Sequence, residues 1–272
     1  MISNLLLVLG VAVLTAALRT VHHPLFHRLS ILGVAGTSFL AGWLLGGSVW
    51  LGVILALSWL FLPWLEILTR VRRMRLPINR RLEPRTPPGR NTFPGFAEVT
   101  EAIEECGFEH VDDIGWEYED NRHFYRISAD ATRRLQAAIC LVEQREIAFY
   151  YLTVTSRTSD GRIFVTWNYP FSYGLKIQPR VKMNRVPGQL SFREMVEAHG
   201  EFLQAEGVRT EDCVNQTPEE TVEAMQQEMR MQIVHNIDAG LLRRDGEHFI
   251  RYTARGLFFL WIQFLRDLVR SL

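Results

Sequence analysis

Apolar residues dominate the first 69 positions of the chain, where only Arg19, Arg28 and Glu66 carry a full charge. Residues 2–18 contain no charged side chain, and residues 30–68 form a second apolar run with the acid near its end. A membrane-spanning helix needs about 20 apolar residues, with about 17 as the lower limit. The first run therefore predicts one span, and the second is long enough for two short spans.

The second apolar run contains a turn signal near its middle. Gly46 and Gly47 are followed by Ser48, a combination that favours a tight turn. We therefore expect spans near 30–46 and 49–68; the alternative is one long, tilted helix.

Small residues are frequent before this turn. Gly42 and Gly46 are four positions apart, a spacing that lets two helices approach closely. They predict either packing against another membrane protein or packing inside the chain's own helical hairpin.

Charge predicts the orientation in the membrane. The loop after the first apolar run holds Arg19 and Arg28 without an acid, and residues 70–90 hold eight arginines and one acid. Basic loops tend to stay on the cytoplasmic side, so three spans put both basic segments there, whereas two spans would expose one of them. A cleaved signal peptide is disfavoured, because no Lys or Arg precedes the first run. We expect a multi-pass protein of a bacterial-type inner membrane, with its soluble part in the cytoplasm.

Residues 70–94 form a basic segment with eight arginines and five prolines. The prolines disfavour a long helix and the charges disfavour burial. We expect an extended connector along the membrane surface, acting as a stop-transfer anchor or as a specific binding segment for anionic lipid or a partner. The expected interfacial contacts are Arg70, Arg72, Arg73, Arg75, Arg80 and Arg81, together with Trp64.

Residues 95–272 predict a cytoplasmic α+β domain, in which an antiparallel β-meander carries helices on one face. A helix is expected over 95–108. About five strands are then expected near 114–118, 123–127, 137–142, 147–155 and 162–168, with a further fragment near 175–181.

Two helices are expected after the strands. Ser191 and Glu194 have the spacing of a capping box at the start of 190–206. Thr217 followed by Pro218 is typical of a helix start, and this second helix is expected to end near residue 239.

A hairpin is predicted around Asp245 and Gly246. A helix, a hairpin with a basic tip and a Thr-x-x-Gly sequence resemble the wing of winged-helix DNA-binding domains over about 20 residues. This resemblance implies a basic helix upstream, but residues 217–239 hold one arginine and four acids before Asp238. Residues 91–272 also hold 28 acids against 20 basic residues, so nucleic acid is not expected as a partner.

The chain ends in an apolar segment, 256–272, with eleven large apolar side chains among its seventeen residues. It is too short and too charged towards its end to span a bilayer. We expect an amphipathic helix that lies in the membrane interface or contacts a partner through Trp261, Phe264 and Leu265; the alternative is a core helix of the domain.

No motif for a nucleotide, a catalytic triad or a metalloprotease occurs in the chain, and no cofactor is expected. His22, His23 and His27 cluster without further ligands nearby, so no metal site is expected. The three cysteines, Cys106, Cys140 and Cys213, are far apart and are expected to be buried as small apolar residues.

These patterns predict a non-catalytic accessory, assembly or scaffold subunit of a larger inner-membrane complex. Its expected partners are a bilayer with anionic head groups and other integral membrane protein subunits. One alternative is a membrane-coupled ligand-sensing module. The other is a membrane-bound enzyme whose site would use His110, Asp112, Asp113, His123 or Tyr125.

Overall fold

The computed structural model describes residues 2–20, 24–89, 92–144 and 147–271. The chain divides into two compact units, each made of segments far apart in sequence. The first comprises Met1–Met74, Ser172–Gly174 and Tyr252–Leu272, and the second comprises Arg75–Phe171 and Leu175–Arg251.

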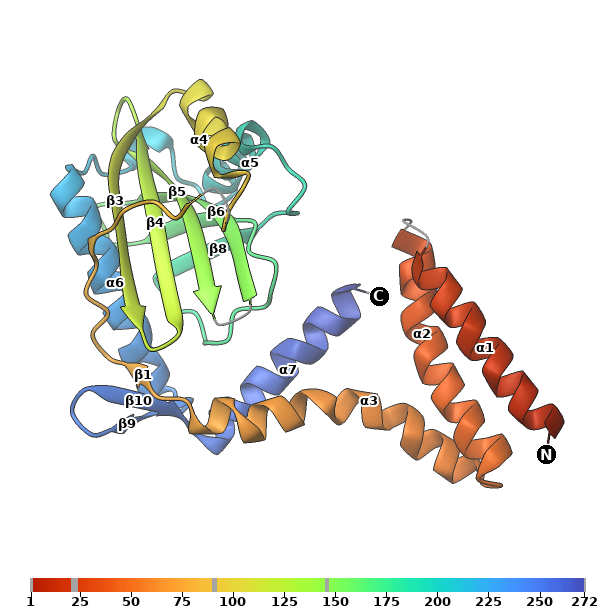
Figure 1. The fold of residues 1–272 in the computed structure, drawn as a ribbon. Helices are drawn as coiled ribbons and strands as arrows, with labels where there is room; N and C mark the ends of the chain where they lie inside the picture. Colours follow the sequence, from red (N-terminus) through yellow and green to blue (C-terminus); the bar gives the residue numbers. More distant parts are fainter. Residues whose placement is uncertain (1, 21–23, 90–91, 145–146, 272) are drawn as a thin grey trace. The chain divides into compact units, whose positions relative to one another are not determined.

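The first unit contains three N-terminal helices, α1 (Ile2–Thr20), α2 (Pro24–Leu40) and α3 (Val49–Thr69) (Figure 1). A π-helical stretch, Ala41–Leu45, extends α2, and a 3₁₀ turn, Val71–Arg73, follows α3. The two segments Ile2–Thr20 and Val49–Arg73 are long and apolar enough to cross a membrane. The apolar part of α2, Leu29–Leu45, is shorter, so the third span stays a prediction.

The turn between α2 and α3 lies at Gly46 and Gly47, as the sequence predicts. Gly47 adopts a φ of 71°, which only glycine tolerates without strain. The helices then pack closely, and Trp59 of α3 donates its indole N–H to Ser38 Oγ of α2 at 2.8 Å. The alternative of one long helix across this region is therefore wrong.

The second unit is built on a seven-stranded sheet with the order β2-β3-β4-β5-β6-β7-β8. Strands β2 to β7 are antiparallel to their neighbours, whereas β8 is parallel to β7, so the sheet is mixed. The strands are β2 (Glu83–Pro84), β3 (Phe108–Tyr118), β4 (Asn121–Asp130), β5 (Leu135–Gln144), β6 (Ile147–Arg157), β7 (Ile163–Trp167) and β8 (Val181–Arg185).

The predicted five-strand meander corresponds to β3–β7, but the additional fragment is misplaced. Residues 175–180 form no strand, and β8 begins at Val181. Pro179 lies in the predicted segment and lacks the N–H that a ladder requires, which explains the shift.

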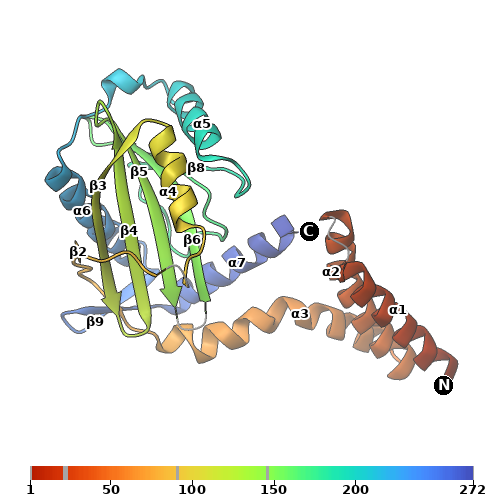
Figure 2. The ribbon, with the colours of Figure 1, turned by 45° about the horizontal axis from the view of Figure 1, so that its top comes forward.

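Helices cover both faces of this sheet (Figures 1 and 2). One face carries α4 (Phe96–Glu105) and α5 (Phe192–Ala205), and the opposite face carries α6 (Pro218–Asp238) through Met225 and Met229. The prediction of helices on one face is therefore wrong. The reason is visible in β5, where residues 137–142 are all buried, as in a strand covered on both sides.

Both predicted helix starts are confirmed. Ser191 accepts a hydrogen bond from the Glu194 N–H, and the Glu194 carboxylate accepts one from the Ser191 N–H. Thr217 and Glu220 make the same reciprocal pair at the start of α6.

A second, three-stranded sheet has the order β1-β10-β9. The predicted hairpin is β9 (Leu242–Asp245) and β10 (Phe249–Tyr252), whose turn contains Gly246 with φ of 80°. Strand β1 (Leu76–Pro77) comes from the segment expected to be an extended connector along the membrane surface.

That segment is instead packed on the domain. Leu82 is only 7% exposed and contacts the cluster that contains Ile114 and Trp116. Its backbone N–H also donates to Gln226 Oε1 of α6 at 3.4 Å. Leu82 therefore holds the segment against the sheet together with the pairing of β1 with β10 and of β2 with β3.

Candidate functional site

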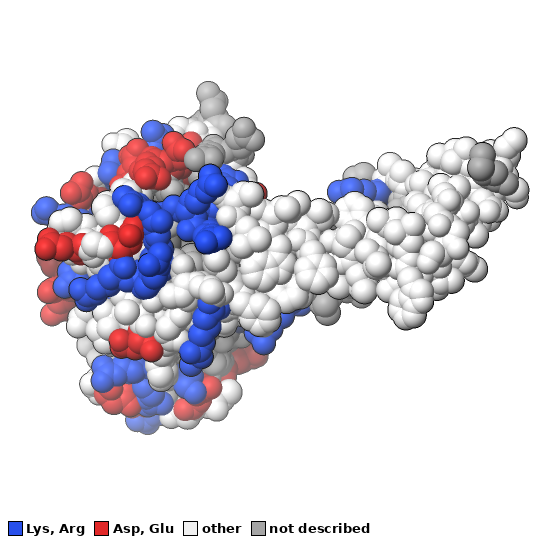
Figure 3. Space-filling model, turned by 90° about the horizontal axis from the view of Figure 1, so that it is seen from below, with Lys and Arg blue, Asp and Glu red and all other residues white. Residues whose placement is uncertain are grey.

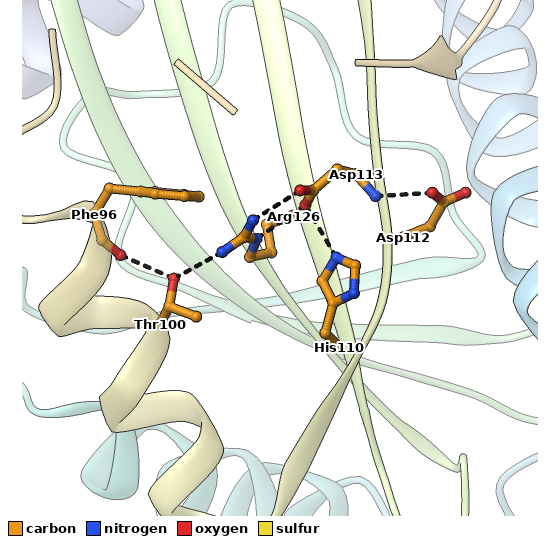
Figure 4. Close-up of polar contacts among 6 residues, drawn as sticks. All are labelled: Phe96, Thr100, His110, Asp112, Asp113 and Arg126. Atoms are coloured by element: carbon orange, nitrogen blue, oxygen red, sulfur yellow. Dashed lines mark hydrogen bonds and ion pairs between the residues drawn. The ribbon is translucent and has the colours of Figure 1, made fainter. Parts of the chain in front are cut away.

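Asp113, one residue of the expected enzyme site, lies in an ion-pair cluster on the α4 face (Figure 4). Arg126 of β4 donates to both its carboxylate oxygens, from Nε at 2.9 Å and from Nη2 at 2.7 Å. The guanidinium also lies 4.6 Å from the Phe96 ring centre and donates to Thr100 Oγ1 at 3.4 Å. The hydrogen bond to Asp113 is the main cause that raises the pKa of Arg126. This cluster fastens α4 to β3 and β4.

His110 and Asp112 lie at the edge of that cluster and make separate contacts with Asp113. His110 Nε2 is 3.2 Å from Asp113 Oδ1, and its side chain is 47% exposed. The pairing of β3 with β4 shifts between His110 and Asp112, so the strand has a bulge there. Asp112 Oδ1 accepts the Asp113 N–H at 2.8 Å.

His123 and Tyr125 lie on the opposite side of the sheet, with Trp116. The His123 ring stacks on Trp116 at a centroid distance of 4.2 Å, and the Trp116 indole donates to the Tyr125 hydroxyl at 3.4 Å. Burial, with the charge of Arg80 as a second cause, lowers the pKa of His123 to about 3. A histidine with so low a pKa is neutral near pH 7 and cannot act as a general acid there.

The five residues of the expected enzyme site therefore do not converge. Asp113 contacts the α4 side, where Arg126 neutralises it, while His123 and Tyr125 belong to the cluster on the α6 side. His123 and Tyr125 are two residues apart on β4, so the sequence alone places them on one face of the strand. Which residues of β3 lie beside them depends on the register of strand pairing, which no local sequence pattern reveals.

Two hollows lie beside these residues. A cavity of about 680 Å³ lies between β3 and α6 and is lined by Leu82, Asp112, Ile114, Glu219, Glu223 and Arg230, among others. A smaller one, of about 260 Å³, is lined by Trp116, His123, Arg85 and Arg122, among others. The larger cavity falls in the size range of small-molecule sites.

A buried polar network around His199 was not predicted as a unit. His199 Nε2 lies 2.8 Å from Ser156 Oγ, and its Nδ1 lies 2.9 Å from Thr166 Oγ1. All three residues are at most 1% exposed, and burial lowers the pKa of His199 to about 4. A serine beside a histidine is the start of a nucleophilic site, but full enclosure leaves no room for a substrate. The network joins α5 to β6 and β7.

Arg157 makes the corresponding connection to α6. It is 9% exposed and donates to both Glu228 oxygens, from Nε at 2.5 Å and from Nη2 at 3.1 Å. A third donor, Nη1, lies 2.7 Å from Gln136 Oε1. This largely enclosed charged pair thus holds α6 to the sheet.

The expected membrane contacts Gly42 and Gly46 are both used inside the helical hairpin. A Cβ on Gly42 would lie 2.6 Å from the Gly52 backbone, and one on Gly46 would lie 2.3 Å from the Leu51 side chain. Of the two packing alternatives, the structure favours the one within the chain.

The first three linker arginines belong to the first unit. Arg70 pairs with Glu66 at 2.8 Å, while Arg72 and Arg73 are exposed in the 3₁₀ turn after α3. In contrast, the helices before them present an almost uncharged surface (Figure 3). These arginines mark the polar end of α3.

The other three of the six expected interfacial arginines belong to the second unit. Arg75 pairs with Asp245 of β9 at 2.9 Å, and the Arg80 guanidinium lies 4.8 Å from the Trp116 ring centre. Arg81 is exposed, with its Nε 3.9 Å from Glu83. Contacts with the protein therefore engage part of the charge expected for the membrane surface.

The remaining interfacial residues are in helices α3 and α7 (Ala254–Ser271). The rings of Trp64 and Trp261 lie 5.6 Å apart. Phe264 is 39% exposed and Leu265 is half-buried.

The cysteines and histidines add no further site among the described residues. Cys140 and Cys213 are buried, as expected, whereas Cys106 is half-buried. No group of three His, Cys, Asp or Glu side chains in the described ranges could hold a metal ion. His22, His23 and the side chain of His27 lie outside the described residues.

No family model, no curated protein and no solved structure matches this chain.

Proposed function

We propose that this chain is a non-catalytic accessory or scaffold subunit of a larger complex in a bacterial-type inner membrane. In this proposal α1–α3 anchor it and the α+β domain lies in the cytoplasm. The observation that supports it most is that the side chains able to do acid–base chemistry are used instead in structural contacts between helices and the sheet. Asp113 is neutralised by Arg126, Glu228 by Arg157, and His199 is enclosed by two hydroxyls.

The membrane unit supports the same proposal through its outer surface. Large apolar side chains such as Leu6, Ile54 and Leu65 are more than 60% exposed. Such a surface requires lipid or the helices of other membrane proteins around it. Gly42 and Gly46, the pair spaced for a close helix partner, are already engaged within the chain, so we expect large side chains to form most lateral contacts.

We further propose that Arg72 and Arg73 provide the contact with anionic head groups. They are exposed directly after the apolar helix, and each basic residue near such a surface contributes about 1 kcal/mol. The variant Arg72→Gln/Arg73→Gln should bind vesicles containing phosphatidylglycerol more weakly, whereas Arg81→Gln, also exposed, serves as the matched control.

Native electrophoresis of gently solubilised membranes tests the complex. The chain should migrate in an assembly larger than itself, and mass spectrometry of that band should identify the same integral membrane proteins in replicate preparations. Dissociation of the assembly in a harsher detergent is the internal control. Migration as a free monomer under the mildest conditions would contradict the proposal.

The larger cavity favours a second candidate, a membrane-coupled ligand-sensing module. Asp112, Glu219 and Glu223 line it against one basic residue, Arg230, so its chemistry suits a cationic ligand. Spermidine is a suitable probe. It should raise the unfolding temperature of the full chain, and Glu223→Gln should weaken this shift. No shift with spermidine would count against this candidate. The enzyme alternative has no such support, because its residues occupy two faces of the sheet.

A further inference from the structure

The pattern of α7 is strongly two-sided. Arg255, Arg266 and Arg270 are spaced so that they share one side of the helix and are exposed. The opposite side is a broad apolar arc centred near Trp261. A helix with a basic face and an aromatic-rich apolar face is typical of those that lie along a membrane surface.

The centre of the apolar arc is held against α3. The Trp261 indole donates its N–H to the Leu60 carbonyl at 3.0 Å. The same ring lies 5.9 Å from that of Phe61 and 5.6 Å from that of Trp64. One hydrogen bond and two aromatic contacts thus define one position of α7 along α3.

The contact lies about one turn before Pro63 in α3. Proline lacks an N–H, so the carbonyl four residues earlier, that of Trp59, has no intrahelical donor. The Trp261 indole bonds the next carbonyl along the helix, that of Leu60.

The two flanks of the apolar arc remain uncovered. Phe258 and Phe264 lie three residues before and after Trp261, which puts them about 60° to either side of it. They are 50% and 39% exposed. Large aromatic side chains are thus exposed on both sides of the contact with α3.

The polar side of α7 is fixed by a short segment of the same unit. Asp267 accepts hydrogen bonds from the Ser172 backbone N–H, at 2.6 Å, and from the Ser172 hydroxyl. Helix α7 is therefore held on two sides, by Trp261 against α3 and by Asp267 against Ser172. It cannot rotate to bury Phe258 and Phe264 without breaking these contacts.

The depth of the contact agrees with an interfacial position. Leu60 lies six residues before Glu66, the first acid of α3, and this corresponds to about 9 Å along the helix axis. Amphipathic helices at a membrane surface bury their apolar face about 5–10 Å below the head groups.

We propose that α7 lies in the plane of the membrane interface, with Phe258 and Phe264 in the acyl-chain boundary and its three arginines among the head groups. The occupant of the exposed apolar face is therefore lipid. This inference rests on the membrane attachment in the proposed function, but not on the partner complex.

Collision measurements on spin labels test the position of α7 in the full chain. In a variant with Cys106, Cys140 and Cys213 changed to Ala, single labels are introduced by Phe258→Cys, Phe264→Cys and Arg266→Cys. The protein is reconstituted in vesicles of phosphatidylcholine and phosphatidylglycerol. Labels at 258 and 264 should collide several-fold more often with oxygen, which concentrates in lipid, than with a water-soluble nickel chelate. The label at 266 should show the reverse.

Two results would overturn the proposal. Nickel accessibility at 258 and 264 equal to that at 266 would put the apolar face in water. Inaccessibility to both reagents would show that protein, and not lipid, covers it.

A second measurement uses the chain with all its aromatic residues. Lipids brominated at a shallow acyl position should quench the fluorescence that is lost on Trp261→Phe, and absence of this quenching would contradict the proposal. Extraction of the chain by alkaline carbonate would instead contradict membrane attachment itself, so the two failures are distinguishable.

Discussion

Arg126 illustrates what the paired charges of this domain contribute at single positions. Its guanidinium holds Asp113 through two hydrogen bonds while lying over the Phe96 ring. Lysine keeps the charge but can form neither the two parallel bonds nor the flat stacking. We expect Arg126→Lys to lower the free energy of unfolding by about 1–2 kcal/mol, measured by urea denaturation of the detergent-solubilised chain.

The matched control for this change is Arg122→Lys. Arg122 is on the same strand and is bonded to Glu117, but its side chain is 63% exposed. Arg122→Lys should not measurably change the free energy of unfolding. Equal effects of the two substitutions would show that the stacked, bidentate geometry contributes nothing.

His199 gives a pH dependence with a defined sign. Its pKa is about 4 in the folded chain because of burial, against about 6.5 in an unfolded chain. The unfolded state therefore binds the proton more tightly. The stabilisation is complete above about pH 6.5 and decreases as pH falls towards 4, by about 3 kcal/mol in total.

Urea denaturation of the wild type and of His199→Asn across this pH range checks this expectation. The variant should be less stable near neutral pH but should lose less stability on acidification. Because His123 is present in both proteins, the difference between them reports His199 alone. An unchanged pH slope would mean that another group causes the acid sensitivity.

At this scale the sequence predicts residue environments better than residue partners. In 190–206, His199 is spaced four residues after Met195 and four before Leu203, on one helical face, and all three are buried. Its partners Ser156 and Thr166 are 43 and 33 residues away, in two different strands. Only the packing of α5 on the sheet brings them together.

Among the elements, those with local signals were predictable. The capping pairs at Ser191 and Thr217 involve residues three positions apart, so the helix starts could be predicted without knowledge of the fold. Layer order could not be predicted in this way. The buried run in β5 contains the information, but a short run of apolar residues is also compatible with a buried helix segment.

The packing of the basic segment 70–94 on the domain could not be predicted from local signals either. Truncation of Leu82 tests whether this side chain holds the segment. Leu82→Ala removes most of a side chain that is 7% exposed, which typically costs about 2–5 kcal/mol in a core. Because Leu82 holds a short peripheral segment, we expect the loss to appear as local release. Trypsin should then cleave several-fold faster after the neighbouring Arg80 and Arg81.

Ile147→Ala is the control, since it truncates a comparable apolar side chain that is 56% exposed. It should leave the cleavage rate unchanged. If Leu82→Ala also left the rate unchanged, the segment would have to be held by its other contacts, such as the pair of Arg75 with Asp245.

For the whole molecule, the number of spans decides which side each part occupies. Two helices satisfy the length requirement, and the apolar part of α2 has 17 residues, the lower limit for a span. Composition alone leaves the third span open. The basic residues Arg19 and Arg28 between α1 and α2 favour it, because three spans keep them on the same side as the arginines after α3.

Thiol labelling in intact cells distinguishes the two topologies. Single cysteines at Ser3→Cys and Glu197→Cys, both exposed positions, are placed in the chain without its natural cysteines. With three spans, an impermeant maleimide should label position 3 in intact cells, but position 197 only after permeabilisation. With two spans both positions should be protected together. Labelling of position 197 in intact cells would reverse the orientation, and the arginines after α3 would then face outward, against the charge bias that motivates this topology.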